Sequence, residues 1–150
     1  MKITVLGGSG FLGSHVSDEL SNYGHKVKIF DIKKSKWLKK NQKMYIGSIL
    51  SSQNLEKAIK GSDIVFNFAA LADLDQALKE PISTAKTNIL GNVLALECCR
   101  KHKVKRFIYA SSIYVNSTEG GFYRSSKKAA EDYVEEYKKI YNLDYTILRF

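Results

Sequence analysis

Residues 2–13 have the sequence KITVLGGSGFLG, in which an apolar run passes directly into a glycine-rich loop. The run at 2–6 predicts a buried strand, and residues 11–23 predict a helix. Glycines between a strand and a helix let the chain turn tightly and let a phosphate approach the backbone. The helix N-terminus then offers free N–H groups to an anion. The segment therefore predicts a site for the pyrophosphate of a dinucleotide.

Apolar runs and amphipathic stretches alternate along the rest of the chain. Further strands are predicted at 26–30, 43–46, 63–68, 106–110 and 144–149, and further helices at 52–60, 82–102 and 123–141. Pro81 is expected to divide its helical region, because proline suits a first turn but breaks a helix interior. The first helix is expected to present Leu12, Val16 and Leu20 on one face. This alternation predicts an α/β Rossmann fold, a doubly wound parallel sheet of about six strands with helices on both faces.

Asp31 follows the second predicted strand, 18 residues after Gly13. A carboxylate at this point can accept hydrogen bonds from the hydroxyls of an adenosine ribose and would repel a 2′-phosphate. Asp31 therefore favours NAD over NADP. Lys33 and Lys34 weaken the preference for NAD over NADP, because their ammonium groups could pair with a 2′-phosphate.

Composition excludes several classes of protein. The chain has 150 residues, of which 44% are hydrophobic, so neither a disordered tail nor a collagen-like repeat fits. No apolar run reaches the ~18 residues of a membrane helix, and the N-terminus is not a signal peptide. Cys98 and Cys99 are adjacent and cannot form a disulfide framework, so we expect a reducing, cytoplasmic location. No spacing of His, Cys or Asp suggests a metal site.

Positive charge is concentrated in one lysine-rich stretch. The formal net charge is +9, and six lysines fall within residues 33–43: Lys33, Lys34, Lys36, Lys39, Lys40 and Lys43. Such a patch could bind nucleic acid or another polyanion. A solvated lysine surface is the alternative, and we favour it because no stacking aromatics are interleaved and no RNA-binding motif is present.

A serine, a tyrosine and a lysine form a candidate catalytic set. Tyr123 and Lys127 stand four residues apart on a predicted helix, so they share one face. A nearby ammonium should lower the pKa of a phenol toward neutrality, which suits removal of a proton from a sugar hydroxyl. Ser112 follows the strand at 106–110, at the edge of the sheet where this fold binds ligands, and could hydrogen-bond the substrate oxygen.

With these residues the chain resembles the extended short-chain dehydrogenase/reductases, in particular the NAD-dependent nucleotide-sugar epimerase/dehydratase family (UDP-glucose 4-epimerase-like). The matching stretches are GGSGFLG at 7–13, Asp31, DIVFNFAA at 63–70, TNILGN at 87–92, RFIYASS at 106–112 and YRSSK at 123–127. The resemblance implies that Ser112, Tyr123 and Lys127 are catalytic. It also implies NAD as cofactor, bound by Gly7, Gly10, Phe11, Leu12, Asp31, Phe68, Ala69, Ala70, Thr87, Tyr123 and Lys127.

The chain departs from the family pattern in at least two places, and it lacks an acid that the dehydratases of the family carry. The family often has Gly-Asp after the third strand, whereas this chain has Gly47-Ser48-Ile49; Ser48 can still form a hydrogen bond, and Ser48 and Ile49 are counted with the cofactor site. The segment between Ser112 and Tyr123 is short and ends in two glycines. Family dehydratases carry an acid two residues after the catalytic strand-end Ser or Thr, but here Ile113 and Tyr114 follow Ser112, which disfavours dehydration.

The resemblance therefore implies an NAD-dependent oxidoreductase or epimerase that oxidises a ring hydroxyl of a nucleotide-linked sugar, at C4 in the preferred version. A dinucleotide-binding domain or sensor without chemistry is the alternative, and a nucleic-acid-binding protein using Lys33–Lys43 is less favoured. Family helices often pair between subunits, so a homodimer is expected. The chain stops at Phe150, directly after a predicted strand, so we expect residues 1–150 to be the NAD-binding domain of an enzyme whose substrate domain is absent here.

Overall fold

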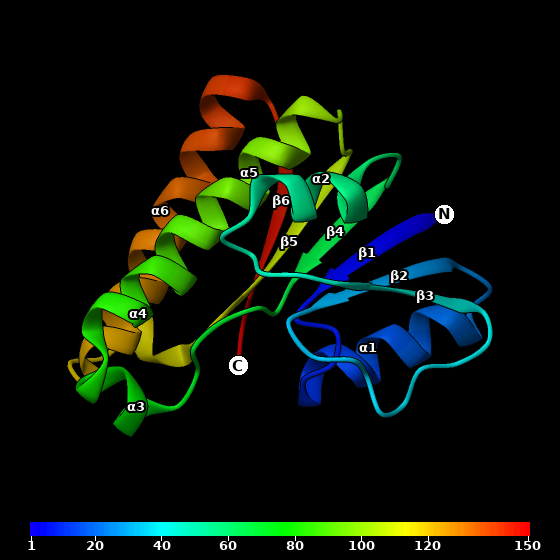
Figure 1. Cartoon of the computed structure of the whole chain (residues 1–150). Helices are drawn as coiled ribbons and strands as arrows, with labels where there is room; N and C mark the ends of the chain where they lie inside the picture. Colours follow the sequence, from blue (N-terminus) through cyan, green and yellow to red (C-terminus); the bar gives the residue numbers. More distant parts are fainter.

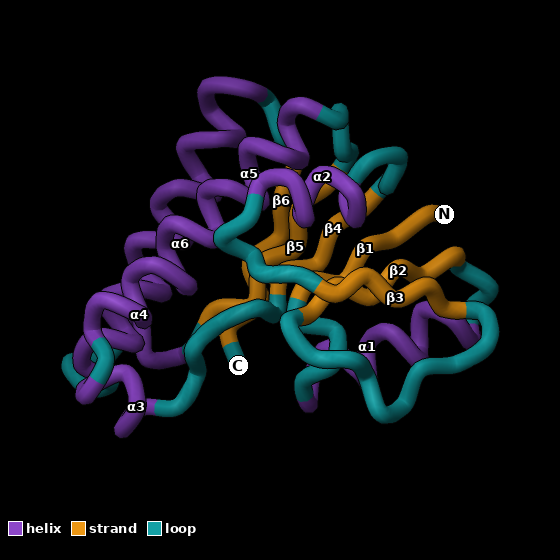
Figure 2. Tube along the Cα trace, in the orientation of Figure 1, coloured by secondary structure: helices purple, strands orange, loops and turns teal.

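The computed structural model describes residues 1–150 as one parallel sheet flanked by helices (Figures 1 and 2). The strands are β1 (Lys2–Leu6), β2 (Lys26–Asp31), β3 (Gln42–Ile46), β4 (Ile64–Asn67), β5 (Arg106–Ser111) and β6 (Asp144–Arg149). Their order is β3-β2-β1-β4-β5-β6, and every neighbouring pair is parallel. The predicted doubly wound sheet is confirmed. The chain builds outward from β1 on one side and from β4 on the other.

Six α-helices, one π-helical turn and one 3₁₀ turn connect the strands. They are α1 (Phe11–Asn22), α2 (Ser52–Ile59), α3 (Leu74–Lys79), α4 (Pro81–Ala85), the π-helical η1 (Lys86–Leu90), α5 (Gly91–Lys101), the 3₁₀ turn η2 (Ile113–Asn116) and α6 (Gly121–Tyr141). Figure 1 shows α1 on one face of the sheet and α2, α5 and α6 on the other. The turn η2 was not predicted, and Pro81 opens α4 as a first-turn proline, as expected.

Two apolar clusters hold these layers together. The larger contains buried side chains from the sheet, such as Phe107, together with Leu55 of α2, Leu96 of α5 and Val134 of α6. The smaller consists of Ile3, Val5, Val27 and Ile29 on the opposite face, the face of α1. Alternate residues of β1 and β2 thus enter different clusters, as a sheet packed on both faces requires.

Helix α1 packs through small residues, which corrects the predicted apolar face. Leu12 is exposed, Val16 and Leu20 are half-buried, and the buried positions are Gly13, Ser14, Ser17 and Ser21. The Ser17 hydroxyl donates to the carbonyl of Gly13 at 2.7 Å, and Ser21 bonds Ser17 in the same way. These serines satisfy their own polar groups inside the helix, so α1 can approach the sheet closely without burying an unpaired hydroxyl.

The single helix predicted at 82–102 is three successive segments, α4, η1 and α5. A π-helical turn at 86–90 widens the helix at the level of Asn88. The Asn88 side chain is turned to the loop after β4, where it bonds the backbone N–H and carbonyl of Leu71 at 2.8 and 3.0 Å. A local π turn is a known way to place one side chain out of the regular helical register. The periodicity of the sequence carries no signal for it.

Gly13 provides a test of this packing. A β-carbon at Gly13 would lie 2.3 Å from the carbonyl oxygen of Gly7, which is backbone and cannot move away. We expect Gly13→Ala to lower the free energy of unfolding by about 2 kcal/mol or more, measured by urea denaturation. Gly10→Ala is the matched control, because its β-carbon meets only Gly7 O at 3.3 Å and its φ is −77°. Equal stability of the two variants would contradict the packing described.

Candidate functional site: a dinucleotide cleft beside a Ser-Tyr-Lys set

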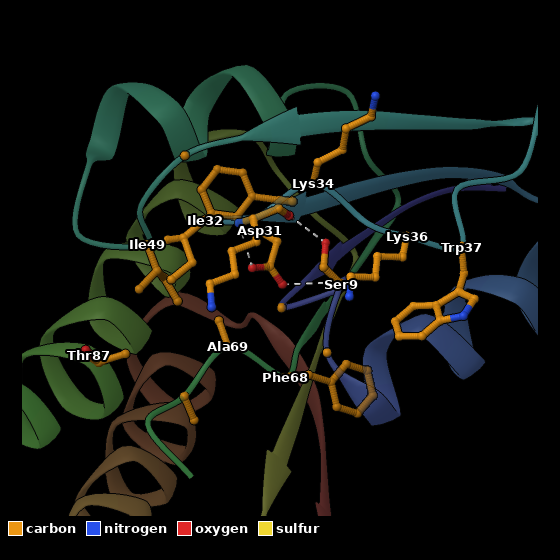
Figure 3. A pocket seen from close by; sticks show the side chains of 16 residues that line it. Ser9, Asp31, Ile32, Lys34, Lys36, Trp37, Ile49, Phe68, Ala69 and Thr87 are labelled. Atoms are coloured by element: carbon orange, nitrogen blue, oxygen red, sulfur yellow. Dashed lines mark hydrogen bonds between the residues drawn. The ribbon is translucent and has the colours of Figure 1, made fainter. Parts of the chain in front are cut away.

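A cavity of about 460 Å³ opens at the carboxyl edge of the sheet, where β1 and β4 lie side by side. The chain leaves these two strands in opposite directions, so the loops that follow them diverge and leave a hollow between them. The lining residues are Gly7, Ser9, Gly10, Phe30, Asp31, Ile32, Lys33, Lys34, Lys36, Trp37, Gly47, Ile49, Phe68, Ala69, Ala70 and Thr87. Figure 3 shows how their side chains surround the hollow.

The glycine loop forms one wall of this cavity. The N–H groups of Gly7 and Gly8 donate to the carbonyl of Phe30 at 2.8 and 3.3 Å, which ties the loop to β2. Gly7 has a φ of +73°, and a β-carbon there would lie 2.5 Å from the backbone nitrogen of Ala69. No side chain caps α1, so the N–H groups of its first turn remain free for an anion.

Asp31 fixes the second wall. One carboxylate oxygen accepts the N–H of Ser9 at 3.0 Å, and the other accepts the N–H of Lys33 at 3.2 Å. The Ser9 hydroxyl donates to the carbonyl of Lys33 at 2.8 Å, so the three residues close a small network between the glycine loop and the β2–β3 connection (Figure 3). Each carboxylate oxygen keeps a lone pair for a further donor.

The loop after β4 forms the third wall and is held by buried asparagines. Asn67 accepts the N–H of Ala69 at 3.1 Å and donates to Asn92 at 2.9 Å. Asn88 fixes Leu71 as described above and also donates to the hydroxyl of Ser126 at 2.9 Å. The loop that carries Phe68, Ala69 and Ala70 is therefore attached to η1 and α5, and through Asn88 to α6.

The structure brings together eight of the predicted cofactor residues as cavity lining: Gly7, Gly10, Asp31, Ile49, Phe68, Ala69, Ala70 and Thr87. Phe11, Leu12, Ser48, Tyr123 and Lys127 do not line it. Phe11 is the first residue of α1; it is 79% exposed, and its ring lies edge-on to the ring of His15. The Ser48 hydroxyl instead accepts the N–H of Leu50 at 3.2 Å.

Five of the lining residues were not predicted from the sequence as cofactor contacts: Ser9, Phe30, Ile32, Trp37 and Gly47. The sequence indicated Lys33, Lys34 and Lys36 only as possible partners of a phosphate or another polyanion. Ser9 could have been found, because it stands between the glycines whose backbone forms the loop. Trp37 could not, because the β2–β3 connection has no repeating pattern that would place its side chain. The lysine-rich stretch is also divided: Lys33, Lys34 and Lys36 line this cavity, whereas Lys40 and Lys43 line a second hollow at the opposite edge of the sheet.

The predicted catalytic residues lie near the same edge, at the end of β5 and the start of α6. Ser112 is buried and follows β5, with its hydroxyl accepting the N–H of Tyr114 at 3.4 Å. Lys127 is 4% exposed, and its ammonium donates to the carbonyl of Ala110 at 2.7 Å. The same ammonium lies 5.7 Å from the ring centre of Tyr123. The three residues therefore surround one small region.

The electrostatics of this set differ from the expectation in one respect. Burial lowers the pKa of Lys127 to about 8, with Glu131 acting in the opposite direction. Burial also raises the pKa of Tyr123, while the side chain of Ser112 lowers it. The expectation that Lys127 lowers the Tyr123 pKa is therefore wrong for this arrangement, because the ammonium is bonded to the Ala110 carbonyl and faces the ring.

Other site types find little support in the structure. No group of three or more His, Cys, Asp or Glu side chains is placed to hold a metal ion. None of the helices is both long enough and apolar enough for a membrane span. Cys98 and Cys99 are free thiols, and burial raises the pKa of both.

Comparison with known proteins places this geometry among characterised relatives. A dTDP-D-glucose 4,6-dehydratase of Dictyostelium discoideum is 32% identical over 185 residues, covering 99% of this chain and 43% of the relative. A UDP-glucose 4-epimerase of Thermotoga maritima, solved with UDP-glucose, has a TM-score of 0.91 at 34% identity, covering 99% of this chain and 55% of that one. A Thermus thermophilus UDP-glucose 4-epimerase in complex with NAD has a TM-score of 0.90 at 28% identity, with 99% and 54% coverage.

The chain spans about half the length of these relatives. The model of the NAD dependent epimerase/dehydratase family matches residues 3–150, which is nearly the whole chain. The resemblance predicted from the glycine loop, Asp31 and the Tyr123–Lys127 spacing is confirmed at the level of the family. The chain belongs to the NAD dependent epimerase/dehydratase family.

Proposed function

We propose that this chain is the NAD-binding and catalytic portion of an epimerase or oxidoreductase that oxidises the C4 hydroxyl of a nucleotide-linked sugar. The observation that carries the proposal is that the dinucleotide cleft and the Ser112-Tyr123-Lys127 set share one edge of the sheet. A cofactor that extends along this edge can reach from Asp31 to the region of Tyr123. Relatives solved with NAD and with UDP-glucose support both ligands.

The residues of the cleft fit NAD. The uncapped first turn of α1 offers N–H donors to a pyrophosphate, and the carboxylate of Asp31 retains acceptor capacity for two ribose hydroxyls. Ile32 and Ile49 supply apolar surface on the same side of the cleft (Figure 3). Bound NAD would supply the hydride acceptor that the side chains of this chain lack.

Each member of the catalytic set has a proposed task. The Ser112 hydroxyl would hydrogen-bond the reacting oxygen of the sugar and so orient it. Tyr123 would hold the proton that leaves this oxygen and return it when the hydroxyl re-forms. Lys127 would supply positive charge beside Tyr123, which favours the phenolate once the ammonium turns from the Ala110 carbonyl toward the hydroxyl.

Epimerisation or simple oxidation suits these residues better than elimination. Dehydration needs an acid beside the catalytic serine, and Ile113 and Tyr114 occupy the two positions after Ser112. The first carboxylate beyond them is Glu119, whose position is separated from Ser112 by the turn η2. The dehydratase among the relatives therefore supports a nucleotide-linked sugar as substrate and not elimination as the reaction of this chain.

Replacing Tyr123 tests the catalytic proposal. We expect Tyr123→Phe to reduce kcat about 10²- to 10⁴-fold for interconversion of UDP-glucose and UDP-galactose, because it removes the group that holds the proton. Anomeric proton signals in NMR spectra measure the rate in the enzyme that contains this chain. Tyr133→Phe makes the same chemical change at an exposed position of α6 and should leave the rate unchanged. Full activity of Tyr123→Phe would refute the proposal. NAD binding without turnover of any nucleotide sugar by the wild type would favour a dinucleotide-binding domain without chemistry.

The burial of Lys127 leads to an independent prediction on stability. Burying a charged lysine lowers the free energy of unfolding, and such a cost is typical of residues that serve function. The Lys127 pKa is lowered from 10.5 to about 8, and at about 1.36 kcal/mol per pKa unit this corresponds to a cost of about 3 kcal/mol for burying the charged lysine. The hydrogen bond to Ala110 offsets about 1 kcal/mol of this cost. We therefore expect Lys127→Met to raise the free energy of unfolding by about 2 kcal/mol at pH 7.

The pH dependence of this gain has a definite sign. Below pH 8 the lysine is charged in both the folded and the unfolded chain, so the full burial cost is present. Between pH 8 and about 10.5 the folded chain loses the proton first, and the difference between wild type and Lys127→Met shrinks. Lys128→Met, at the exposed neighbouring position, should change stability little. Urea unfolding at several pH values measures the difference, and a wild type more stable than Lys127→Met at pH 7 would contradict the prediction.

A further inference from the structure

Glu131 is a buried carboxylate that the proposed chemistry does not use. It is 1% exposed on α6 and is held by Arg149 of β6, whose Nε and Nη2 donate to the two carboxylate oxygens at 3.0 and 2.8 Å. This two-point geometry fixes the plane of the carboxylate. Burying a carboxylate is costly and replacing an ion pair by apolar residues is often neutral, so packing alone gives no reason to keep it.

The position of Glu131 in α6 points to Lys127. Tyr123, Lys127 and Glu131 are spaced at four-residue intervals along one uninterrupted helix, so they share a face that is turned toward β5 and β6. Lys127 needs negative charge there, because its only hydrogen bond is to the neutral carbonyl of Ala110. Glu131 raises the pKa of Lys127 against the effect of burial.

We propose that Glu131, oriented by Arg149, is the positioning residue that keeps Lys127 charged beside Tyr123. This inference rests on the proposed function, because it assigns Glu131 a role through Lys127. Burial alone would raise the pKa of Glu131, but the hydrogen bonds from Arg149 lower it overall, so the carboxylate stays ionised. The pair also joins β6 to α6, so the charge of Lys127 depends on correct docking of the last strand.

The other groups around Lys127 do not offer the same charge. Tyr109 of β5 and Tyr123 of α6 face it with their rings, 5.0 and 5.7 Å from the ammonium. Burial raises the pKa of both tyrosines, so both are neutral at pH 7. The turn η1 and helix α5 contact α6 on either side of Lys127 in sequence, where the uncharged side chains of Asn88 and Asn92 bond Ser126 and Ala130. Glu131 is thus the carboxylate whose negative charge offsets the positive charge of Lys127.

The test follows the titration of Lys127 directly. Protein made with lysine labelled with ¹³C at the ε-carbon gives one NMR signal per lysine, and loss of a signal in Lys127→Arg identifies Lys127. We expect a wild-type midpoint near pH 8 and a midpoint lowered by about one unit in Glu131→Gln. Asp132→Asn is the matched control: it removes a carboxylate from the next residue of α6, which is exposed and pairs with Lys128, and should shift the midpoint by less than about 0.2 units.

A second variant keeps the proposal testable if Glu131→Gln does not fold. Removal of the guanidinium in Arg149→Met should lower the Lys127 midpoint in the same direction as Glu131→Gln, because the buried carboxylate then loses the donors that orient it and keep it ionised. Arg149→Lys should restore the midpoint in part. An unchanged midpoint in Glu131→Gln, or an unchanged or raised one in Arg149→Met, would show that the pair is only a structural tie. These readouts need neither cofactor nor turnover, so a failure of the proposed function would appear separately, as an active Tyr123→Phe enzyme.

Discussion

The parallel pairing of β1 with β4 is the constraint on which the rest of the molecule depends. It places two strands at the centre of the sheet whose following loops turn away from each other, and the cleft is the space between them. The pairing also brings Gly7 against the backbone of Ala69, so closely that no side chain fits. Glycine at this point is therefore a packing requirement of the sheet as well as a requirement of phosphate binding.

Polar groups inside the structure serve to hold the walls of this cleft. Asn67, Asn88 and Asn92 attach the loop after β4 to the helices behind it, and every one of these bonds is buried or partly buried. Such networks are stable only when their members are satisfied, and here they are. Lys127 and Glu131 differ from these asparagines, because each places a full charge in the interior, near the site where we propose that the chemistry occurs.

Prediction from the sequence succeeded where local chemistry determines structure. The strand–helix alternation predicted the sheet, and the glycine loop and Asp31 predicted Gly7, Gly10 and Asp31 as cavity lining, because each depends on a few neighbouring positions. The other five predicted lining residues, Ile49, Phe68, Ala69, Ala70 and Thr87, came from the family resemblance. Prediction failed where contacts between residues far apart in the sequence determine the structure. The π turn at Asn88 exists because its side chain reaches Leu71, and α1 packs through serines because of how close the sheet lies. The bond from Lys127 to Ala110 likewise joins residues 17 apart in sequence, and the expected effect on Tyr123 was wrong for that reason.

We propose that the cleft between β1 and β4 binds NAD with its ribose on Asp31, and calorimetric titration measures this binding. NAD⁺ and then NADP⁺ would be titrated into the wild-type protein and into Asp31→Asn. Quenching of the fluorescence of Trp37 gives a second signal, because Trp37 is the one tryptophan of the chain and lines the cavity. We expect one NAD⁺ site in the wild type, weaker binding of NADP⁺, and a smaller preference for NAD⁺ over NADP⁺ in Asp31→Asn. Absence of NAD⁺ binding, or the same preference for NAD⁺ over NADP⁺ in the wild type and in Asp31→Asn, would contradict binding of the ribose by Asp31.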